Sequence, residues 1–147
     1  MRILIQRVKE ACVTVEKKVC GSIKSAGALV FLGVHKEDKI ETAKRLAKKL
    51  IDLRMFSDEN NKMNLSLKDI NGEVLIVSQF TLYANCDSGR RPDFVDAASP
   101  KEALEAYNCF VEEVKKEIDV VQTGIFGASM EVSLCNDGPV TFLIERF

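Results

Sequence analysis

Hydroxyl and amide side chains gather where one apolar run of the sequence ends. The segment Glu73–Phe80 has the length and composition of a buried strand, and its end carries Ser78, Gln79, Phe80 and Thr81. Ligand-binding loops commonly leave a sheet at strand ends, and backbone N–H groups released from the ladder there can stabilise a developing oxyanion. These four residues are therefore candidates for a catalytic segment. The alternative is a strand that frays into polar residues.

The segment Asn136–Thr141 combines a tight-turn signal with a proline. Asp137 and Gly138 alone would make an ordinary two-residue hairpin turn, but Pro139 restricts the residue before it and removes a backbone donor. Proline fits a tight turn when its peptide bond is cis, and the sequence leaves the isomer open. A cis bond would let the carbonyls of Gly138 and Pro139 face a ligand ammonium group. The alternative is an edge turn with an incidental proline.

Two further segments offer ligand contacts. Arg90 and Arg91 are adjacent in a loop-like segment, and guanidinium groups match the oxygens of a phosphate. Phe126 lies between two glycines within Thr123–Met130, where its ring can stack on a nucleobase. The alternatives are two solvated surface arginines and a phenylalanine that belongs to the core, which is the commoner place for that residue.

Metal chemistry and nucleophile–base chemistry have few candidates. A zinc site needs clustered ligands and a Ser–His–Asp or Cys–His hydrolase needs a positioned base, but His35 is the one histidine of the sequence. The five cysteines are odd in number, widely spaced and without a Cys-x-x-Cys pair: Cys12, Cys20, Cys86, Cys109 and Cys135. We therefore expect reduced thiols, no metal and no cofactor. A cysteine hydrolase or redox protein using Cys86 or Cys135 with His35 is the alternative.

Strand and helix signals follow one another in an order that predicts a mixed α/β fold. Apolar or alternating runs predict strands at 2–8, 11–16, 19–23, 28–34, 63–67, 73–80, 119–123, 130–135 and 140–145. Helical spacing of apolar residues predicts one helix after Asp38 and a second after Ser99. The order predicts a single domain, residues 1–147, built as a mixed, β-rich sheet or partial barrel with two packed helices.

Local signals mark the ends of these elements. Asp38 followed by Glu41 resembles a capping box for the first helix, and Ser99 with Pro100 predicts the start of the second. The dipeptide at 71–72 is Asn-Gly, which is a strong hairpin signal. Residues 84–98 are rich in Asn, Asp, Gly, Arg and Pro and predict a long loop.

Composition and charge limit the class of protein. With 147 residues, 46% hydrophobic and 29% charged, the chain is typical of one globular domain, and its net charge of -1 argues against a protein that coats nucleic acid. The charge is uneven, because residues 36–54 are net basic and residues 99–119 net acidic. No run approaches the roughly 20 apolar residues of a membrane helix. The first eight residues read as a strand rather than a signal peptide, so we expect a cytoplasmic protein.

Together these segments resemble the D-aminoacyl-tRNA deacylases, also called the D-tyrosyl-tRNA deacylase family. The matching segments, in chain order, are Gln6–Val8, Ser78–Ala84, Gly89–Phe94, Thr123–Met130 and Asn136–Thr141. Of these, Ser78–Ala84 and Asn136–Thr141 look like the two signature motifs of the family, and the resemblance covers essentially the whole chain. One departure is the turn Glu16–Lys18, where the family commonly has an Asp-Gly-type turn.

The resemblance implies a metal-free homodimer that hydrolyses the ester between a D-amino acid, or glycine, and the 3′-terminal adenosine of tRNA. Such an enzyme acts in proofreading, and has no DNA or membrane partner. Gly138 and Pro139 would enter the partner's site as a cis peptide, bind the substrate's amino group and reject L side chains. Arg7 would brace that turn. Binding to the tip of a tRNA needs only a few phosphate contacts, so we expect it to be weak and salt-sensitive.

The resemblance also implies roles for the other segments. Ser78, Gln79, Phe80 and Thr81 would line the wall opposite the Gly-Pro turn. Phe126 would help to hold the terminal adenosine, Met130 would contact substrate, and Arg90 with Arg91 would contact tRNA. The chemistry would use the 2′-hydroxyl of the tRNA with backbone groups near Phe80 and Thr81. A Thr81 nucleophile is one alternative, and a non-catalytic module that binds RNA 3′ ends is another.

Overall fold

The chain forms a mixed α/β structure, which confirms the predicted fold class. The computed structural model describes residues 1–87 and 89–145. Its elements are β1 (Arg2–Val15), β2 (Lys18–Ile23), β3 (Gly27–Gly33), α1 (Ile40–Ile51), β4 (Phe56–Ser57), β5 (Met63–Leu65), β6 (Glu73–Ser78), η1 (Phe80–Tyr83), α2 (Pro100–Lys115), β7 (Val121–Thr123) and β8 (Glu131–Glu145). None of the helices in these ranges is long and apolar enough to cross a membrane.

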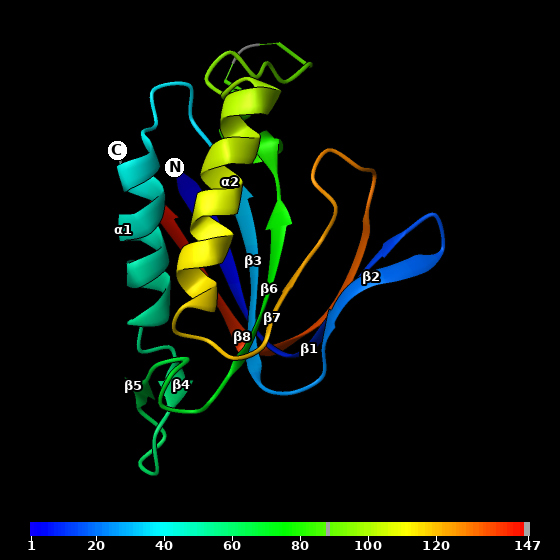
Figure 1. The fold of residues 1–147 in the computed structure, drawn as a ribbon. Coiled ribbons are helices and arrows are strands. Elements are labelled where there is room, and N and C mark those ends of the chain that lie inside the picture. Colours follow the sequence, from blue (N-terminus) through cyan, green and yellow to red (C-terminus); the bar gives the residue numbers. More distant parts are fainter. Residues whose placement is uncertain (88, 146–147) are drawn as a thin grey trace.

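The main sheet curls into a nearly closed barrel (Figure 1). Its order is β2-β1-β3-β6-β7, and β8 pairs with β1 along the other side of that strand. The pairs β3–β6 and β6–β7 are parallel, whereas β1 pairs antiparallel with all its neighbours. The outer strands β2 and β7 meet at Gly21, where a Cβ would lie 2.4 Å from the Thr123 carbonyl oxygen. Glycine is therefore required for this close approach.

Two apolar clusters hold the fold together. Helices α1 and α2 lie side by side against one face of the sheet (Figure 1), and the larger cluster between them includes Ile5, Leu46, Leu50, Phe110 and Val114. A smaller cluster inside the curved sheet contains Val8, Val13, Leu29, Leu75 and Val77. Complete burial of such a side chain contributes roughly 1.5–3 kcal/mol relative to exposure. The two clusters hold β6, which ends at the candidate site, from both faces.

Two pairs of predicted strands are single strands. The predictions 2–8 and 11–16 correspond to β1, and 130–135 and 140–145 correspond to β8. The pairing of β1 with β8 shifts twice, between Gln6 and Val8 and between Val8 and Glu10. Between Gln6 and Val8 lies one residue of β1, whereas four residues of β8 lie between their partners Thr141 and Asn136. The extra residues of β8 loop out as a bulge, and the strand continues beyond them.

The turn between β1 and β2 is a two-residue hairpin without glycine. Glu16 and Lys17 both have positive φ, 47° and 65°, which is the geometry of the turn that best matches strand twist. The departure from an Asp-Gly-type sequence at this turn therefore leaves a hairpin in place. The predicted hairpin at Asn71-Gly72 is wrong, because the strand that follows, β6, pairs in parallel with β3 and β7.

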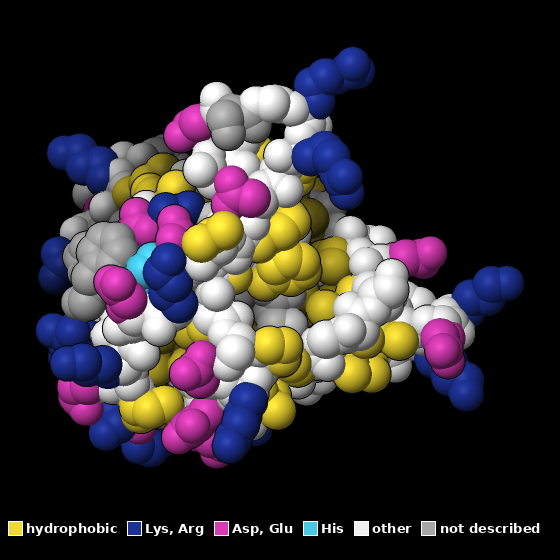
Figure 2. Space-filling model, turned by 90° about the horizontal axis from the view of Figure 1, so that it is seen from above, with side chains coloured by type: hydrophobic (Ala, Val, Ile, Leu, Met, Phe, Trp, Pro, Cys, Tyr) yellow, Lys and Arg dark blue, Asp and Glu magenta, His cyan; other side chains and the backbone are white. Residues whose placement is uncertain are grey.

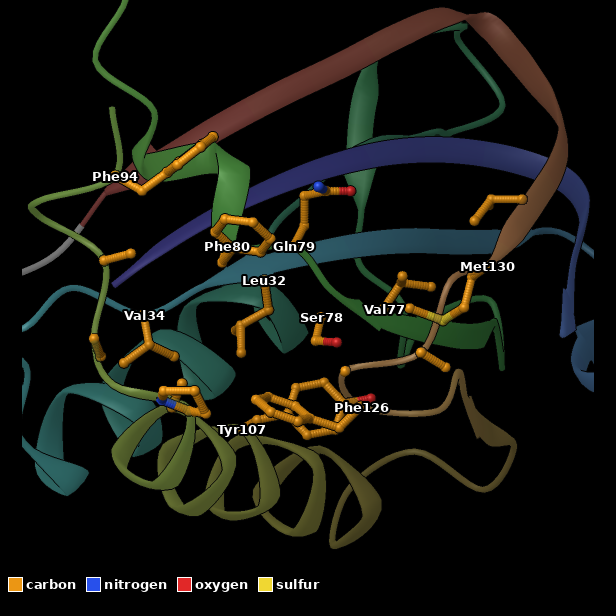
Figure 3. Close-up of a pocket in the computed structure, with 17 residues that line it drawn as sticks. Leu32, Val34, Val77, Ser78, Gln79, Phe80, Phe94, Tyr107, Phe126 and Met130 are labelled. Carbon is orange, nitrogen blue, oxygen red and sulfur yellow. The ribbon is translucent and has the colours of Figure 1, made fainter. Parts of the chain in front are cut away.

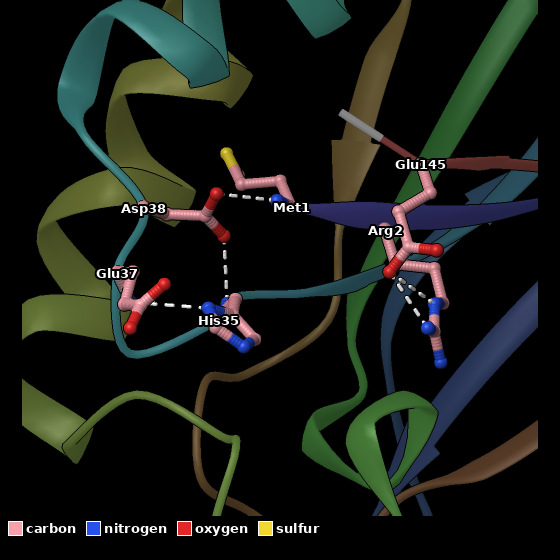
Figure 4. Close-up of polar contacts among 6 residues, drawn as sticks. All are labelled: Met1, Arg2, His35, Glu37, Asp38 and Glu145. Atoms are coloured by element: carbon pink, nitrogen blue, oxygen red, sulfur yellow. Dashed lines mark hydrogen bonds and ion pairs between the residues drawn. The ribbon is translucent and has the colours of Figure 1, made fainter. Parts of the chain in front are cut away.

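The start of α2 follows its sequence signal, but the start of α1 does not. The Ser99 side chain accepts from the Glu102 N–H in a complete capping box. In contrast, α1 has Lys39 at its N-cap without a side-chain bond. Asp38 is used elsewhere: its carboxylate binds the Met1 ammonium (2.5 Å) and accepts from the His35 N–H (2.7 Å) (Figure 4). Tertiary contacts thus replace the predicted cap.

Candidate functional site

The candidate catalytic segment begins at Ser78, where β6 ends. The sequence predicted that this strand would end two residues later, at Phe80. The ladder continues to the Gln79 N–H, which donates to the Leu32 carbonyl (2.8 Å). Gln79 then leaves strand geometry, with φ −146° and ψ 84°, and η1 begins at Phe80. The first N–H groups of a helix have no partner within it, so the amides of Phe80 and Thr81 point out of η1 as potential donors to a ligand oxygen.

A cavity of about 620 Å³ lies beside this segment. That volume is in the usual range for a small-molecule site, roughly 300–1,000 Å³. The walls come from the ends of β3 and β6, the start of α2, and two segments that we call the 84–98 loop and the 124–130 loop (Figure 3). The predicted site residues that line it are Ser78, Gln79, Phe80, Phe126 and Met130.

The surface around the cavity is apolar at its centre and charged at its periphery. Figure 2 looks down on the end of the molecule that carries the 84–98 loop, and hydrophobic side chains gather in the middle of that face. Lys and Arg side chains project around its edge, with Asp and Glu side chains among them. The centre of this face suits an apolar or aromatic group of a ligand.

Phe126 and Tyr107 form one aromatic wall of the cavity. Their ring centroids are 5.7 Å apart, with the planes tilted by 57° (Figure 3). The Tyr107 hydroxyl donates to the Ile76 carbonyl (2.9 Å), and burial raises the pKa of Tyr107 to about 12. Tyr107 therefore stays protonated at neutral pH and acts as a fixed wall rather than as a general base.

A second aromatic pair brings the 84–98 loop to the site. The rings of Phe80 and Phe94 meet edge to face with centroids 4.9 Å apart, and both line the cavity. Phe80 is 58% exposed, so much of its ring is open to a ligand. Sequence reasoning did not name Phe94 or Tyr107 as site residues. Phe94 ends a segment that the sequence had singled out, but Tyr107 belongs to the apolar stripe of α2 and carried no separate signal.

Thr81 lies outside the cavity lining and has no base beside it among the described residues. It is exposed, and its hydroxyl accepts a hydrogen bond from the Gln79 side-chain amide. His35 is held elsewhere, because its Nδ1 accepts from the Glu37 N–H (3.1 Å) (Figure 4). Its ring also packs on the ring of Tyr83. The geometry therefore gives the Thr81 hydroxyl no group that would activate it as a nucleophile.

The Gly138–Pro139 peptide is cis and forms the bulge in β8. The Asn136 side chain closes this loop at its base, since it accepts from the Val140 N–H (2.7 Å) and donates to the Val140 carbonyl (3.2 Å). Gly138 and Pro139 are exposed and do not line the cavity of their own chain. The bulge is thus a fixed, projecting feature.

Arg7 joins this bulge to the body of the protein. Its side chain is only 10% exposed, and Nε donates to the Asp137 carbonyl (2.9 Å) while Nη1 donates to the Met55 carbonyl (2.7 Å). Nε also lies 3.4 Å from the Asp137 carboxylate. Arg7 itself is not part of the cavity lining. Its contacts are those of a side chain that braces the bulge from within.

The remaining candidates lie away from the cavity. Arg90 and Arg91 are exposed in the 84–98 loop, whose ends are held by the backbone pair Asn85–Asp93. All five cysteines are unpaired in the structure, and none lines the cavity. Within residues 1–87 and 89–145, no group of three or more His, Cys, Asp or Glu side chains is placed to hold a metal ion.

Comparison with known proteins places the chain in a family. The family described as D-Tyr-tRNA(Tyr) deacylase matches residues 4–145. The chain is 57% identical to a D-aminoacyl-tRNA deacylase of Thermosipho africanus, over 99% of this chain and 97% of the relative. It is 54% identical to the enzyme of the same name from Dictyoglomus turgidum, over 99% and 92%.

Two solved structures resemble the chain over nearly its whole length. A structure titled c-Myc DNA Unwinding Element Binding Protein is 38% identical, with a TM-score of 0.93 and 99% of both chains covered. A second structure, titled as a probable eukaryotic D-amino acid tRNA deacylase, is 17% identical, with a TM-score of 0.87 and 97% of both chains covered. At that identity the second structure supports the fold alone.

Proposed function

The chain belongs to the D-Tyr-tRNA(Tyr) deacylase family, and from that membership we propose that it hydrolyses the ester between a D-amino acid and the 3′-terminal adenosine of tRNA. The products are free D-amino acid and tRNA, and glycine esters are included among the substrates. The observation that carries this proposal is the cavity itself, where Ser78 and Gln79 at the end of β6 lie across from the Phe126–Tyr107 wall. A polar edge beside an aromatic wall fits an aminoacyl ester next to an adenine.

We assign chiral selection to the Gly138–Pro139 bulge acting on a partner subunit's cavity. The bulge is exposed, braced by Arg7 and outside the cavity of its own chain, so it is free to enter another. Apolar side chains that a partner would cover include Phe80 (58% exposed) and Leu143 (59% exposed). The two carbonyls of the bulge would bind the substrate's ammonium group and leave no room for an L side chain.

The proposed chemistry relies on positioning and backbone donors. The ester carbonyl would accept from the amides of Phe80 and Thr81, which stabilise the negative charge that develops on its oxygen. Attack, assisted by the 2′-hydroxyl of the terminal ribose, forms a bond from water oxygen to the carbonyl carbon, and the 3′-oxygen leaves with a proton. An aminoacyl ester is already activated, so this positioning can supply the several kcal/mol of barrier lowering required. We expect no metal or other cofactor.

The proposal is tested by incubating the protein with D-tyrosyl-tRNA and L-tyrosyl-tRNA, each with and without a chelator. We expect release of D-tyrosine at a rate unaffected by chelator, and no release from the L ester above background. Equal rates for both enantiomers would contradict chiral selection, and loss of activity with chelator would contradict metal independence. A non-catalytic module would bind the acylated 3′ end without releasing amino acid.

Removal of the Thr81 hydroxyl separates the two mechanisms. We expect Thr81→Val to lower kcat by less than about 10-fold, because the backbone amide remains and only the contact with Gln79 is lost. Thr81→Ser, which keeps a hydroxyl, is the matched control. Single-turnover assays with D-tyrosyl-tRNA measure both variants. A fall of Thr81→Val to background, with binding of the substrate intact, would establish Thr81 as the nucleophile instead.

Arg90 and Arg91 are proposed to contact tRNA phosphates beyond the cavity. Both are exposed in the 84–98 loop, which also supplies Phe94 to the site. The logarithm of affinity falls as the logarithm of salt concentration rises, and each lost phosphate contact makes this slope shallower by about 1. Binding of D-aminoacyl-tRNA measured at several salt concentrations should show this shallower slope in Arg90→Ala and in Arg91→Ala. An unchanged slope would contradict their contact with tRNA phosphates.

We expect the enzyme to act in translation proofreading in the cytoplasm.

A further inference from the structure

The 124–130 loop closes on itself beside the cavity. Gly127 has a φ of +76°, and the Ala128 N–H donates to the Ile125 carbonyl (3.2 Å), so the chain reverses within the loop. At one end the Gly124 N–H donates to the Ile76 carbonyl (3.1 Å), which fixes Gly124 to β6. At the other end is Met130. The loop therefore brings two residues that are six apart in sequence against each other.

The contact between these ends depends on the absence of a side chain at Gly124. A Cβ built there would lie 2.5 Å from the Met130 sulfur and 3.6 Å from a Val13 methyl carbon. The ordinary van der Waals separation for such atoms is about 3.5–4.0 Å. The thioether of Met130 thus rests on the Gly124 backbone, where it packs with the cluster inside the curved sheet and lines the cavity together with Val77 (Figure 3).

We propose that Gly124 is a positioning residue that sets the Met130 wall of the cavity and, through it, the fit of the acylated 3′ end. Any side chain at 124 must displace the thioether by about 1 Å to restore normal contact. Met130 lines the cavity, so a displacement of its thioether changes the shape of the cavity wall. The inference rests on the proposed function, because it names what controls substrate fit in that same site.

Gly124→Ala is expected to lower kcat/KM for D-tyrosyl-tRNA about 10- to 100-fold, mainly through a higher KM, because a wall displaced by about 1 Å disturbs substrate positioning. In the background of Met130→Val, which removes the δ atom, Gly124→Ala should leave kcat/KM at the level of Met130→Val alone. In the background of Met130→Leu, which keeps atoms at that position, Gly124→Ala should still lower kcat/KM. Ser129→Ala, at an exposed residue of the same loop outside the cavity lining, is the matched control and should leave both constants unchanged.

A second measurement reads the contact without using activity. In protein labelled with ¹³C at the methionine methyl groups, Gly124→Ala should shift the Met130 resonance and leave those of the buried Met1 and Met55 unchanged. An unmoved Met130 resonance, or a KM defect of Gly124→Ala that persists in the Met130→Val background, would overturn the inference. Absence of D-aminoacyl-tRNA hydrolysis by the unsubstituted protein would instead contradict the proposed function, so the two failures are distinguishable.

Discussion

Gly138→Ala is expected to lower kcat/KM for D-tyrosyl-tRNA by about 100-fold, because it moves the bulge by about 1 Å or more. Gly138 has a φ of +146°, which residues other than glycine rarely adopt. A Cβ at this position would lie 2.6 Å from a Val140 methyl carbon and 2.8 Å from the Val140 nitrogen. The second atom is backbone, so the clash cannot be relieved by rotating a side chain. The Asn136 bonds that close the loop are then lost or lengthened.

The control for this variant is another glycine with a positive φ, but one without close neighbours. Gly89 has a φ of +73° and nothing within 4 Å of a built Cβ. Gly89→Ala should therefore show backbone strain of about 1 kcal/mol without a change in the rate ratio for D and L esters. If Gly138→Ala keeps full rate and selectivity, the assignment of chiral selection to the bulge is wrong. Steady-state rates with both tyrosyl-tRNA enantiomers provide the comparison.

Arg7→Ala should both destabilise the protein and reduce its activity strongly. The guanidinium donates to two carbonyls, and that of Met55 belongs to a fully buried residue, so its removal leaves unsatisfied acceptors. Hydrogen bonds to a charged group contribute about 1.5–3 kcal/mol each, and we expect a total loss of about 3 kcal/mol in the free energy of unfolding. The ion pair with Asp137 adds little, because that carboxylate is 42% exposed.

Two further variants separate bracing from general destabilisation. Arg7→Lys keeps the charge, but its single ammonium group cannot reproduce the two diverging bonds. We expect it to lose less of the free energy of unfolding than Arg7→Ala does, while its rate of D-tyrosyl-tRNA hydrolysis still falls strongly. Arg54→Ala removes an exposed arginine close to Met55 and should change the unfolding free energy by less than about 0.5 kcal/mol. Urea denaturation and D-tyrosyl-tRNA hydrolysis measure the two effects. An Arg7→Lys protein with full activity would contradict the bracing role.

Local chemistry predicted the elements whose ends it controls directly. Ser99 and Glu102 cap α2 through bonds that span three residues, and the prediction is confirmed. Asp38 carried an equally strong local signal, but the Met1 ammonium, remote in sequence, occupies its carboxylate. The Asn71 prediction failed for a related reason: a turn residue specifies a reversal of the chain, and the partner of the following strand is chosen by distant residues.

The long strands were divided in the prediction because their alternation is interrupted. Along β1 the buried positions are odd-numbered up to Arg7 and again from Ala11, but between them Val8 is buried and both Lys9 and Glu10 are exposed. An interrupted alternation is read as two strands, although the partner strand pairs on both sides of the interruption. The same limit applies to the site, where Ser78 and Phe126 carried sequence signals but Tyr107 joins them only through the packing of α2.

The bulge in β8 also has a consequence for solubility. β8 is a long strand with β1 as its one partner in the described sheet, and an uninterrupted edge of that length would be a template for strand addition by other chains. The bulge divides its ladder into the runs 131–136 and 141–145, and Pro139 offers no N–H between them. The bulge to which we assign substrate selection thereby also protects the protein against edge-to-edge aggregation.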